Sequence, residues 1–218
     1  MSIQKKIENG REYRAMSLDT VIEDEKIVEG YATTFNEPYH LYYFEDEKGN
    51  HEVKEMVSRN AFEEADMSDV IFQFDHEGKV YARLSNGTME LIPDEKGLKV
   101  RANLGGTAIG RDLYEEIKGG YINKMSFGFT VADDNITRLD SGDYLRTISK
   151  IRKLFDVSAV SYPQNNFTEI SARNHCEGVI AEIEAERLRV EEEARIEQEK
   201  RENLLARIKS LKGESNGD

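Results

Sequence analysis

The sequence predicts a mainly β domain with a few helices, of the α+β class, followed by a long, charged C-terminal helix. Between about residues 12 and 172, short apolar stretches alternate with polar residues and are separated by turn residues. Beyond that point the composition shifts to Glu, Arg, Lys and Ala, which favour a helix. A chain of 218 residues has room for one domain of ordinary size and an appendage.

Runs rich in Ile, Val, Tyr and Phe predict the strands of the domain, at 26–34, 70–74, 79–84, 88–92, 98–104, 144–151 and 154–161. The dipeptide Asn86-Gly87 suits a turn with positive φ at both central residues, so it predicts a hairpin between 79–84 and 88–92. Residues 93–97 predict another turn, and Arg152-Lys153 separates the last two strands. We expect a mostly antiparallel sheet, either a sandwich or a closed barrel.

Two helices are expected within the β domain. A short one is predicted from Ser58 to about Ala65, with Ser58 as its N-cap. A stronger one is predicted from Thr107 to Lys118, where Thr107 caps the start and Gly119-Gly120 ends the helix.

The expected organisation is a flexible N-terminus at 1–11, a domain at 12–172, a charged helical tail at 173–212 and a disordered end at 213–218. Apolar residues of the tail recur by sevens, at Ile183, Val190, Leu204 and Leu211, which is a coiled-coil-like pattern. Three arrangements fit the tail. They are a solvated single helix held by Glu–Arg pairs, self-association, and docking on a partner helix.

The charge balance excludes several classes of partner. With 30 Lys and Arg against 43 Asp and Glu, the formal net charge is -13, which argues against nucleic acid and against a polybasic membrane contact. Cys176 is the one cysteine, so an internal disulfide framework is excluded and a reducing compartment is expected. We find no secretory signal and no apolar run long enough to span a bilayer, and we expect a soluble, intracellular protein.

Three residues carry the candidate chemistry: His76, Ser126 and Asp156. A hydroxyl, an imidazole and a carboxylate are the parts of a nucleophile, its base and an orienting group. Each also has an ordinary interpretation. In that interpretation none of the three is catalytic. Ser126 would be an ordinary serine in a strand, His76 an ordinary histidine in a turn, and Asp156 a residue on the solvent-exposed face of an edge strand.

Other motifs give no site. Residues 105–112 have the glycine spacing of a phosphate-binding loop but lack its Lys and Ser or Thr. Residues 51–55 lack the second histidine of a zinc-protease helix. We therefore expect no cofactor and no metal.

Four short segments follow one another along the chain, and their order is informative as well as their residues. They are VEGYA at 28–32, FDH at 74–76, KMSFGF at 124–129 and LFDVSAVSYP at 154–163. Together they resemble the prohead serine proteases of tailed bacteriophages, over about residues 12–172. The resemblance implies a fold similar to the herpesvirus assemblin proteases, which is a β-barrel surrounded by helices. It also implies that Ser126 is the nucleophile, His76 the general base and Asp156 the residue that orients the imidazole. Many relatives carry Glu at the last position, so the shorter Asp requires its strand to lie closer to the histidine.

The resemblance also implies a setting. Such enzymes act in the host cytoplasm inside the immature capsid, the prohead. Their substrates are the scaffold protein or the scaffold segment of the major capsid protein, and usually the enzyme itself. We further consider self-association through the helical tail. The alternative is a non-catalytic assembly protein with a β docking domain and a helical tail.

Overall fold

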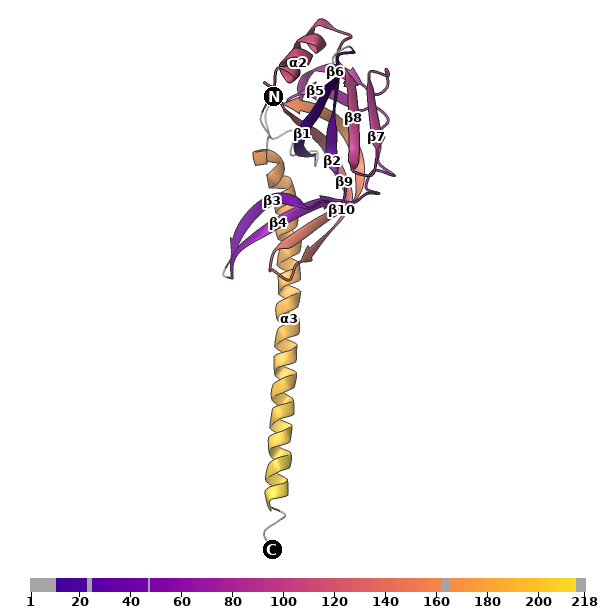
Figure 1. Ribbon diagram of the computed structural model, residues 1–218. Helices are drawn as coiled ribbons and strands as arrows, with labels where there is room; N and C mark the ends of the chain where they lie inside the picture. The colour runs from indigo at the N-terminus through magenta and orange to yellow at the C-terminus, as the bar shows by residue number, and fades with distance from the viewer. Residues whose placement is uncertain (1–10, 23–24, 47, 162–164, 215–218) are drawn as a thin grey trace. The chain divides into compact units, whose positions relative to one another are not determined.

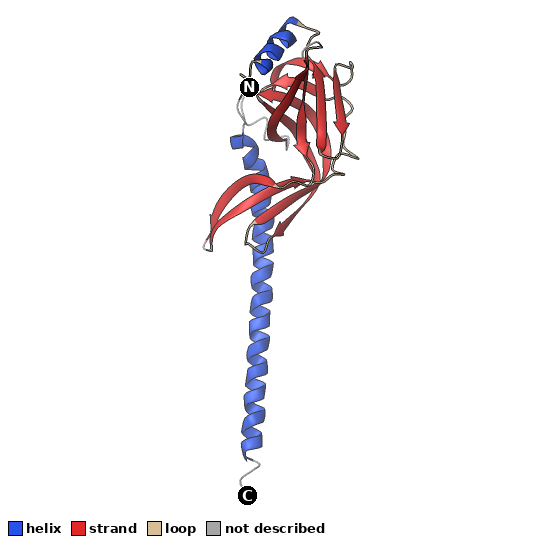
Figure 2. Cartoon of the chain, in the orientation of Figure 1, coloured by secondary structure: helices blue, strands red, loops and turns tan. Residues whose placement is uncertain are grey.

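The computed structural model describes residues 11–22, 25–46, 48–161 and 165–214 (Figure 1). The side chains of 17–22, 165–171 and 208–214 are not described. The chain forms two compact units, one up to Asn174 and one from His175. The first is mainly β and the second is helical, so the α+β class is confirmed (Figure 2).

The β unit is built on one large sheet. Its strands are β1 (Glu12–Ile22), β2 (Ile27–Thr34), β3 (Tyr39–Asp46), β4 (Gly49–Val57), β5 (Ile71–Phe74), β6 (Glu77–Arg83), β7 (Met89–Pro93), β8 (Gly97–Asn103), β9 (Lys124–Arg138) and β10 (Tyr144–Val160). The main path runs β3-β4-β10-β9-β1-β2-β8-β7, and β5 and β6 branch from β10. Among the described strands this path does not close on itself, so the predicted barrel is corrected to an open sheet. Most strand pairs are antiparallel, as the sequence predicts, and β10 also pairs in parallel with β4 and β5.

The strands expected at 144–151 and 154–161 form one continuous strand, β10. Arg152-Lys153 does not end the strand. The alternation of apolar and polar residues shifts there, and irregularities in the register between β10 and β9 accommodate this shift. In Figure 1 the outer ends of β9 and β10 and the β3–β4 hairpin extend away from the other strands of the β unit. The opposite end of β10 lies between β9 and β5, where it pairs with both.

The predicted hairpin at Asn86-Gly87 is wrong. Strand β6 pairs with β5 and strand β7 pairs with β8, so the two segments expected to pair belong to different hairpins. Gly87 has a positive φ of 74°, while Asn86 is not among the positive-φ residues. The turn at 93–97 does join β7 to β8, and the Asp94 carboxylate accepts from the backbone N–H groups of Lys96 and Gly97.

The stronger helix prediction is confirmed as α2 (Ala108–Lys118). The Thr107 hydroxyl accepts from the Gly110 N–H, and Gly119 stands at the C-cap. The helix expected from Ser58 to Ala65 is absent from the described residues there. That segment forms a series of turns with bonds such as Ala61 N–H to the Ser58 carbonyl.

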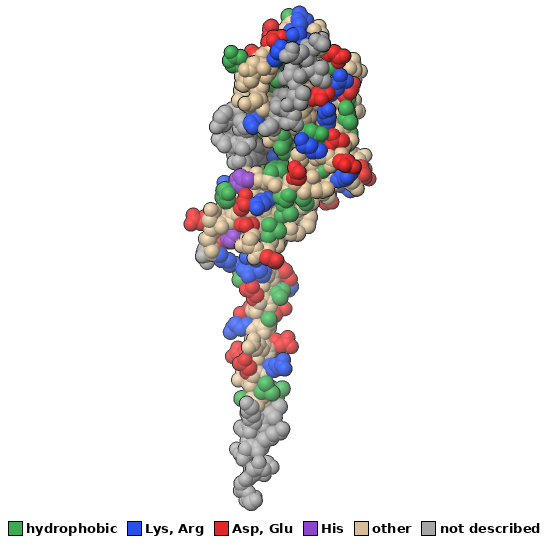
Figure 3. Space-filling view, in the orientation of Figure 1, with side chains coloured by type: hydrophobic (Ala, Val, Ile, Leu, Met, Phe, Trp, Pro, Cys, Tyr) green, Lys and Arg blue, Asp and Glu red, His purple; other side chains and the backbone are tan. Residues whose placement is uncertain are grey.

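The described part of the second unit consists of α3 (Asn165–Glu214) from His175 onward. The helix begins eight residues before the predicted start of the tail at 173. Acidic and basic side chains alternate along the visible surface of the helix (Figure 3). Pairs such as Glu184–Arg187 and Glu192–Arg195 join successive turns. The predicted flexible start and disordered end fall largely outside the described residues. Within the described residues, no helix combines the length and apolar character needed to cross a membrane.

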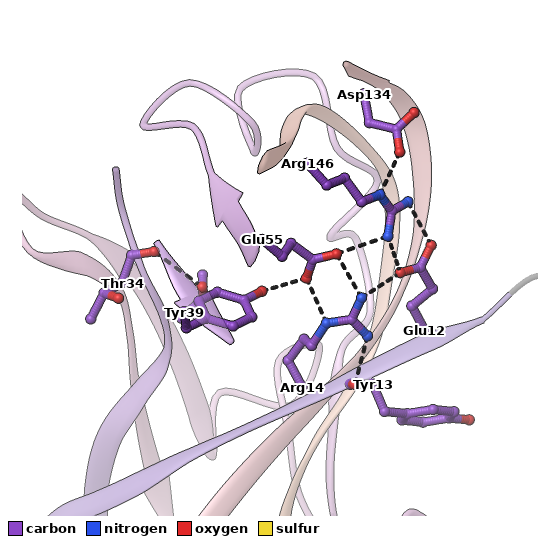
Figure 4. A network of polar contacts seen from close by, with 9 residues as sticks. Glu12, Tyr13, Arg14, Thr34, Tyr39, Glu55, Asp134 and Arg146 are labelled. Carbon is purple, nitrogen blue, oxygen red and sulfur yellow. Dashed lines mark hydrogen bonds and ion pairs between the residues drawn. The ribbon is translucent and has the colours of Figure 1, made fainter. Parts of the chain in front are cut away.

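The core of the β unit is apolar and lies on one face of the strands, where Phe127 and Phe129 stack at 4.6 Å between ring centroids. Beside it lies a buried ion cluster (Figure 4), which we define as Glu12, Arg14, Glu55, Asp134 and Arg146. Strands β1, β4, β9 and β10 contribute these side chains, so charges far apart in sequence tie four strands together.

Glu55 lies at the centre of the ion cluster and is fully buried. Its carboxylate accepts from Arg14 at 2.5 and 2.7 Å and from Arg146 at 2.8 Å. The Tyr39 hydroxyl donates to the same carboxylate. Burial alone would raise the pKa of Glu55, but the two guanidinium groups outweigh burial and lower it to about 2. Glu55 therefore stays ionised at neutral pH.

Candidate active site

The candidate site lies on the face of β1, β9 and β10 opposite to Phe127 and Phe129. The register pairs Gly128 with Tyr13 on one side and Asp156 on the other. The next row pairs Ser126 with Ala15 and with Ser158. Because paired residues in antiparallel strands share a face, the hydroxyl and the carboxylate are neighbours on one surface of the sheet.

An irregularity in β10 turns Asp156 toward this face. Leu154 pairs with Phe129, whereas Asp156 pairs with Gly128, so two residues of β10 are matched by one residue of β9. Without this extra residue, Leu154 and Asp156 would point to the same face of the strand. The carboxylate thus avoids the apolar core. Since β10 lies between β9 and β5 here, the edge-strand interpretation of Asp156 is wrong.

His76 reaches the site from the tip of the β5–β6 hairpin. Asp75 and His76 have φ values of 48° and 59°, which is the pattern of a two-residue turn with positive φ at both positions. Such values cost energy in non-glycine residues and persist where surrounding contacts hold them. Here the Asp75 N–H donates to the Ala159 carbonyl, and the Asp75 carboxylate accepts from the N–H and hydroxyl of Ser161. These bonds fix the turn to the end of β10.

The three predicted residues meet in one chain of hydrogen bonds. The Nδ1 atom of His76 is bonded to Oδ2 of Asp156, and Nε2 lies 2.7 Å from Oγ of Ser126. A carboxylate can only accept, so Nδ1 carries the proton and Nε2 is left to accept the Ser126 hydroxyl proton. The side chains of His76 and Asp156 are only 3% and 4% exposed. The arrangement can remove a proton from a hydroxyl and hold it on the imidazole.

Three further residues complete the site, Tyr13, Gly128 and Ser158, and the sequence analysis named none of them as a candidate. The Ser158 hydroxyl donates to Oδ2 of Asp156 at 2.8 Å. The Tyr13 ring packs against the His76 imidazole at 4.3 Å between centroids. A Cβ at Gly128 would lie 2.6 Å from Oδ1 of Asp156, so glycine is needed for the carboxylate to approach. One signal in the sequence could have indicated Ser158. Ser158 lies two residues after Asp156, as Gly128 lies two residues after Ser126, and residues two apart in a strand point to the same face.

The described residues contain no group of three or more His, Cys, Asp and Glu side chains arranged to hold a metal ion. The site consists of one hydroxyl, one imidazole and one carboxylate, with the Ser158 hydroxyl as a further donor.

Comparisons with known proteins identify the family of the chain. The model of the family described as caudovirus prohead serine protease matches residues 12–181. The prohead protease of Enterobacteria phage HK97 is 31% identical over 130 residues, which cover 59% of this chain and 56% of that relative. The aligned region thus spans little more than half of the relative's length. No solved structure matches the chain. The family model covers most of the chain, and the chain therefore belongs to the caudovirus prohead serine protease family.

Proposed function

We propose that this chain is a serine endopeptidase in which Ser126, His76 and Asp156 form the catalytic triad. The observation that carries the proposal is the continuous chain of bonds from the Ser126 hydroxyl through both nitrogens of His76 to Asp156. The 2.7 Å approach of Nε2 to Oγ favours an enzyme over the alternative of a non-catalytic docking protein, which needs no such contact. Membership of a family of serine proteases supports the same reaction.

The proposed reaction follows from the positions of the protons. Ser126 Oγ attacks the carbonyl carbon of the scissile peptide while His76 Nε2 takes the hydroxyl proton. The imidazolium then gives this proton to the leaving amine, and the peptide C–N bond breaks. Water hydrolyses the acyl-enzyme with His76 again acting as base. Asp156 holds the Nδ1–H and stabilises the imidazolium, and Ser158 holds the same carboxylate oxygen.

The substrates that we propose are the scaffold protein or the scaffold segment of the major capsid protein, and the enzyme itself. The place of action would be the prohead in the host cytoplasm. The support is the family and the relative named as a prohead protease. The acidic balance of the chain fits an enzyme that has no need to bind DNA. Self-association through α3 would use its exposed Val190 and Leu204, which recur at heptad spacing.

Co-expression with the capsid protein of the same phage tests the proposal. The wild type is expected to convert the capsid protein to a shorter form, and the Ser126→Ala variant is expected to leave it intact at equal folded concentration. Mass spectrometry of both proteins gives the cut positions, including any in the enzyme itself. Continued processing by the Ser126→Ala variant would rule out the assignment of the nucleophile.

A further inference from the structure

His76 needs more support than its bond to Asp156. A single hydrogen bond at Nδ1 fixes one point of the imidazole but leaves the ring free to tilt about the Nδ1–Oδ2 line. A tilt would move Nε2 away from Ser126 Oγ, although the two atoms must stay within hydrogen-bond reach for proton transfer. The hairpin tip that carries His76 also has an unfavourable backbone conformation at both turn residues.

We propose that Tyr13 is a positioning residue for the His76 imidazole, and that its ring keeps Nε2 directed at Ser126. The inference rests on the proposed function, because the orientation of the imidazole matters only if it acts as the base. The two rings lie 4.3 Å apart between centroids with an interplanar angle of 62°, which is a T-shaped contact. A flat ring packed across the imidazole blocks the tilt that one hydrogen bond permits.

Gly128 makes room for the Tyr13 ring. The two residues are partners in the β1–β9 register, and a Cβ at position 128 would lie 2.7 Å from Cε1 of Tyr13. The same Cβ would also meet the Asp156 carboxylate, so one glycine lets both neighbours of the imidazole approach. This packing leaves the Tyr13 ring little freedom to move.

The buried ion cluster holds Tyr13 from the other side of the strand. Glu12 and Arg14 flank it in β1 and point into the cluster, whereas Figure 4 shows the Tyr13 ring directed away from it. The Arg14 guanidinium also donates to the Tyr13 carbonyl at 2.9 Å. The backbone of Tyr13 is therefore fixed on both sides by buried charges.

The phenol of Tyr13 is kept neutral. Burial raises the pKa of Tyr13, the Asp156 carboxylate raises it further, and a hydrogen bond with Arg11 offsets only part of this. A neutral ring adds no second negative charge beside the imidazole. The ring, rather than the hydroxyl, is the part of Tyr13 that contacts His76.

The test is the rate at which an alkyl fluorophosphonate labels the full-length chain. In this reaction Ser126 Oγ forms a bond to phosphorus, the P–F bond breaks, fluoride leaves and the hydroxyl proton passes to His76. The dependence on probe concentration separates the maximal labelling rate from probe binding. We expect Tyr13→Phe to stay within about twofold of wild type and Tyr13→Leu to lose roughly tenfold in maximal rate with probe binding unchanged.

Tyr114→Leu is the matched control, because Tyr114 is a fully buried tyrosine in α2 and undergoes the same change. It should label at the wild-type rate. Equal rates for Tyr13→Leu and Tyr13→Phe would overturn the proposal, as would a loss confined to probe binding or an equal loss in Tyr114→Leu. If wild type is not labelled on Ser126, the proposed function fails instead, so the two failures are distinguishable.

A spectroscopic readout covers the case in which Tyr13→Leu does not fold. The ring current of Tyr13 should shift the His76 imidazole proton resonances, and Tyr13→Phe should retain this shift. Tyr13→Met, whose flexible side chain fills irregular space, should lose both the shift and the labelling rate. Unchanged His76 resonances in Tyr13→Met would contradict the positioning role.

Discussion

Among the described residues, the β unit contains two buried polar clusters that share strands β9 and β10, and they differ in how their polar groups are held. In the ion cluster, Glu55 is bonded to two guanidinium groups. In the candidate site, His76 forms one bond on each nitrogen, to Ser126 and to Asp156. The first arrangement holds the Glu55 carboxylate ionised at neutral pH, and the second is a chain of hydrogen bonds along which a proton can pass. Glu55 is thus held by two oppositely charged groups, whereas the His76 imidazole links one hydroxyl to one carboxylate.

The backbone beneath the two clusters differs at one point. His76 stands in a turn with positive φ, whereas no residue of the ion cluster has a positive φ. Register irregularities lie beside both clusters, next to Asp134 and next to Asp156. Strain and irregular pairing are tolerated where they direct a side chain to a reacting atom. We expect changes in the site to affect rate and changes in the ion cluster to affect stability.

The largest effect is expected from Asp156→Asn, which keeps the shape of the side chain but removes its charge. The amide can donate to Nδ1 and so favours the wrong tautomer of His76, leaving Nε2 protonated. The labelling rate should fall by roughly 10²–10⁴-fold, with some activity retained because Ser126 and His76 remain. A melting temperature close to that of wild type should accompany this loss. A variant as fast as wild type would show that Asp156 does not orient the base.

The next largest effect is expected from Arg146→Met. Arg146 bonds to Glu12, Glu55 and Asp134 and is 1% exposed, so its removal leaves buried carboxylates with fewer partners. We expect a loss of roughly 3–5 kcal/mol in the free energy of unfolding. Labelling per folded molecule should fall less than tenfold. Urea denaturation measures the first and probe kinetics the second, and a loss of rate without a loss of stability would reverse the proposed division.

Acid should weaken the ion cluster in a defined range. The folded pKa of Glu55 is about 2 against an ordinary value of 4.5, so the folded state binds this proton less readily than the unfolded state. The associated stability is fully present above about pH 4.5 and is lost as the pH falls toward 2, on the order of 3 kcal/mol in all. Denaturation of Glu55→Gln should show lower stability at pH 7 and a flatter pH dependence across this range. An equal slope in both proteins would assign the acid sensitivity to other groups.

The smallest effect calibrates the other three. Thr107 caps α2 and belongs to neither polar cluster, so Thr107→Ala should cost about 1 kcal/mol of stability and leave the labelling rate unchanged. A large effect on rate would mean that α2 is coupled to the site.

The sequence predicted features that depend on local pattern. Short segments were enough to identify α2 with its Thr107 cap, the turn at 93–97, and the three residues that the structure brings together at the site, His76, Ser126 and Asp156. The positive-φ turn was assigned to Asn86-Gly87, whereas the two-residue turn lies at Asp75-His76. Local propensity favours Asn-Gly, but the pairing of β5 with β6 and of β7 with β8 decides where the hairpins form.

The ion cluster could not be predicted for a related reason. Glu12 and Arg146 are separated by 134 positions and meet only because β1 and β10 flank β9. In sequence such residues resemble ordinary surface charges, since long-range pairing leaves no local signal. The extra residue in β10 that directs Asp156 to the site is equally a property of the pairing.

The site of fluorophosphonate attachment is the measurement that tests the central claim most directly. The full-length wild type is labelled, digested and sequenced by tandem mass spectrometry, beside His76→Ala and Arg146→Met. We predict one modified position, Ser126, with the label lost in His76→Ala and retained in folded Arg146→Met. Attachment to another serine, or undiminished labelling of Ser126 in His76→Ala, would contradict the assignment of chemistry to this cluster.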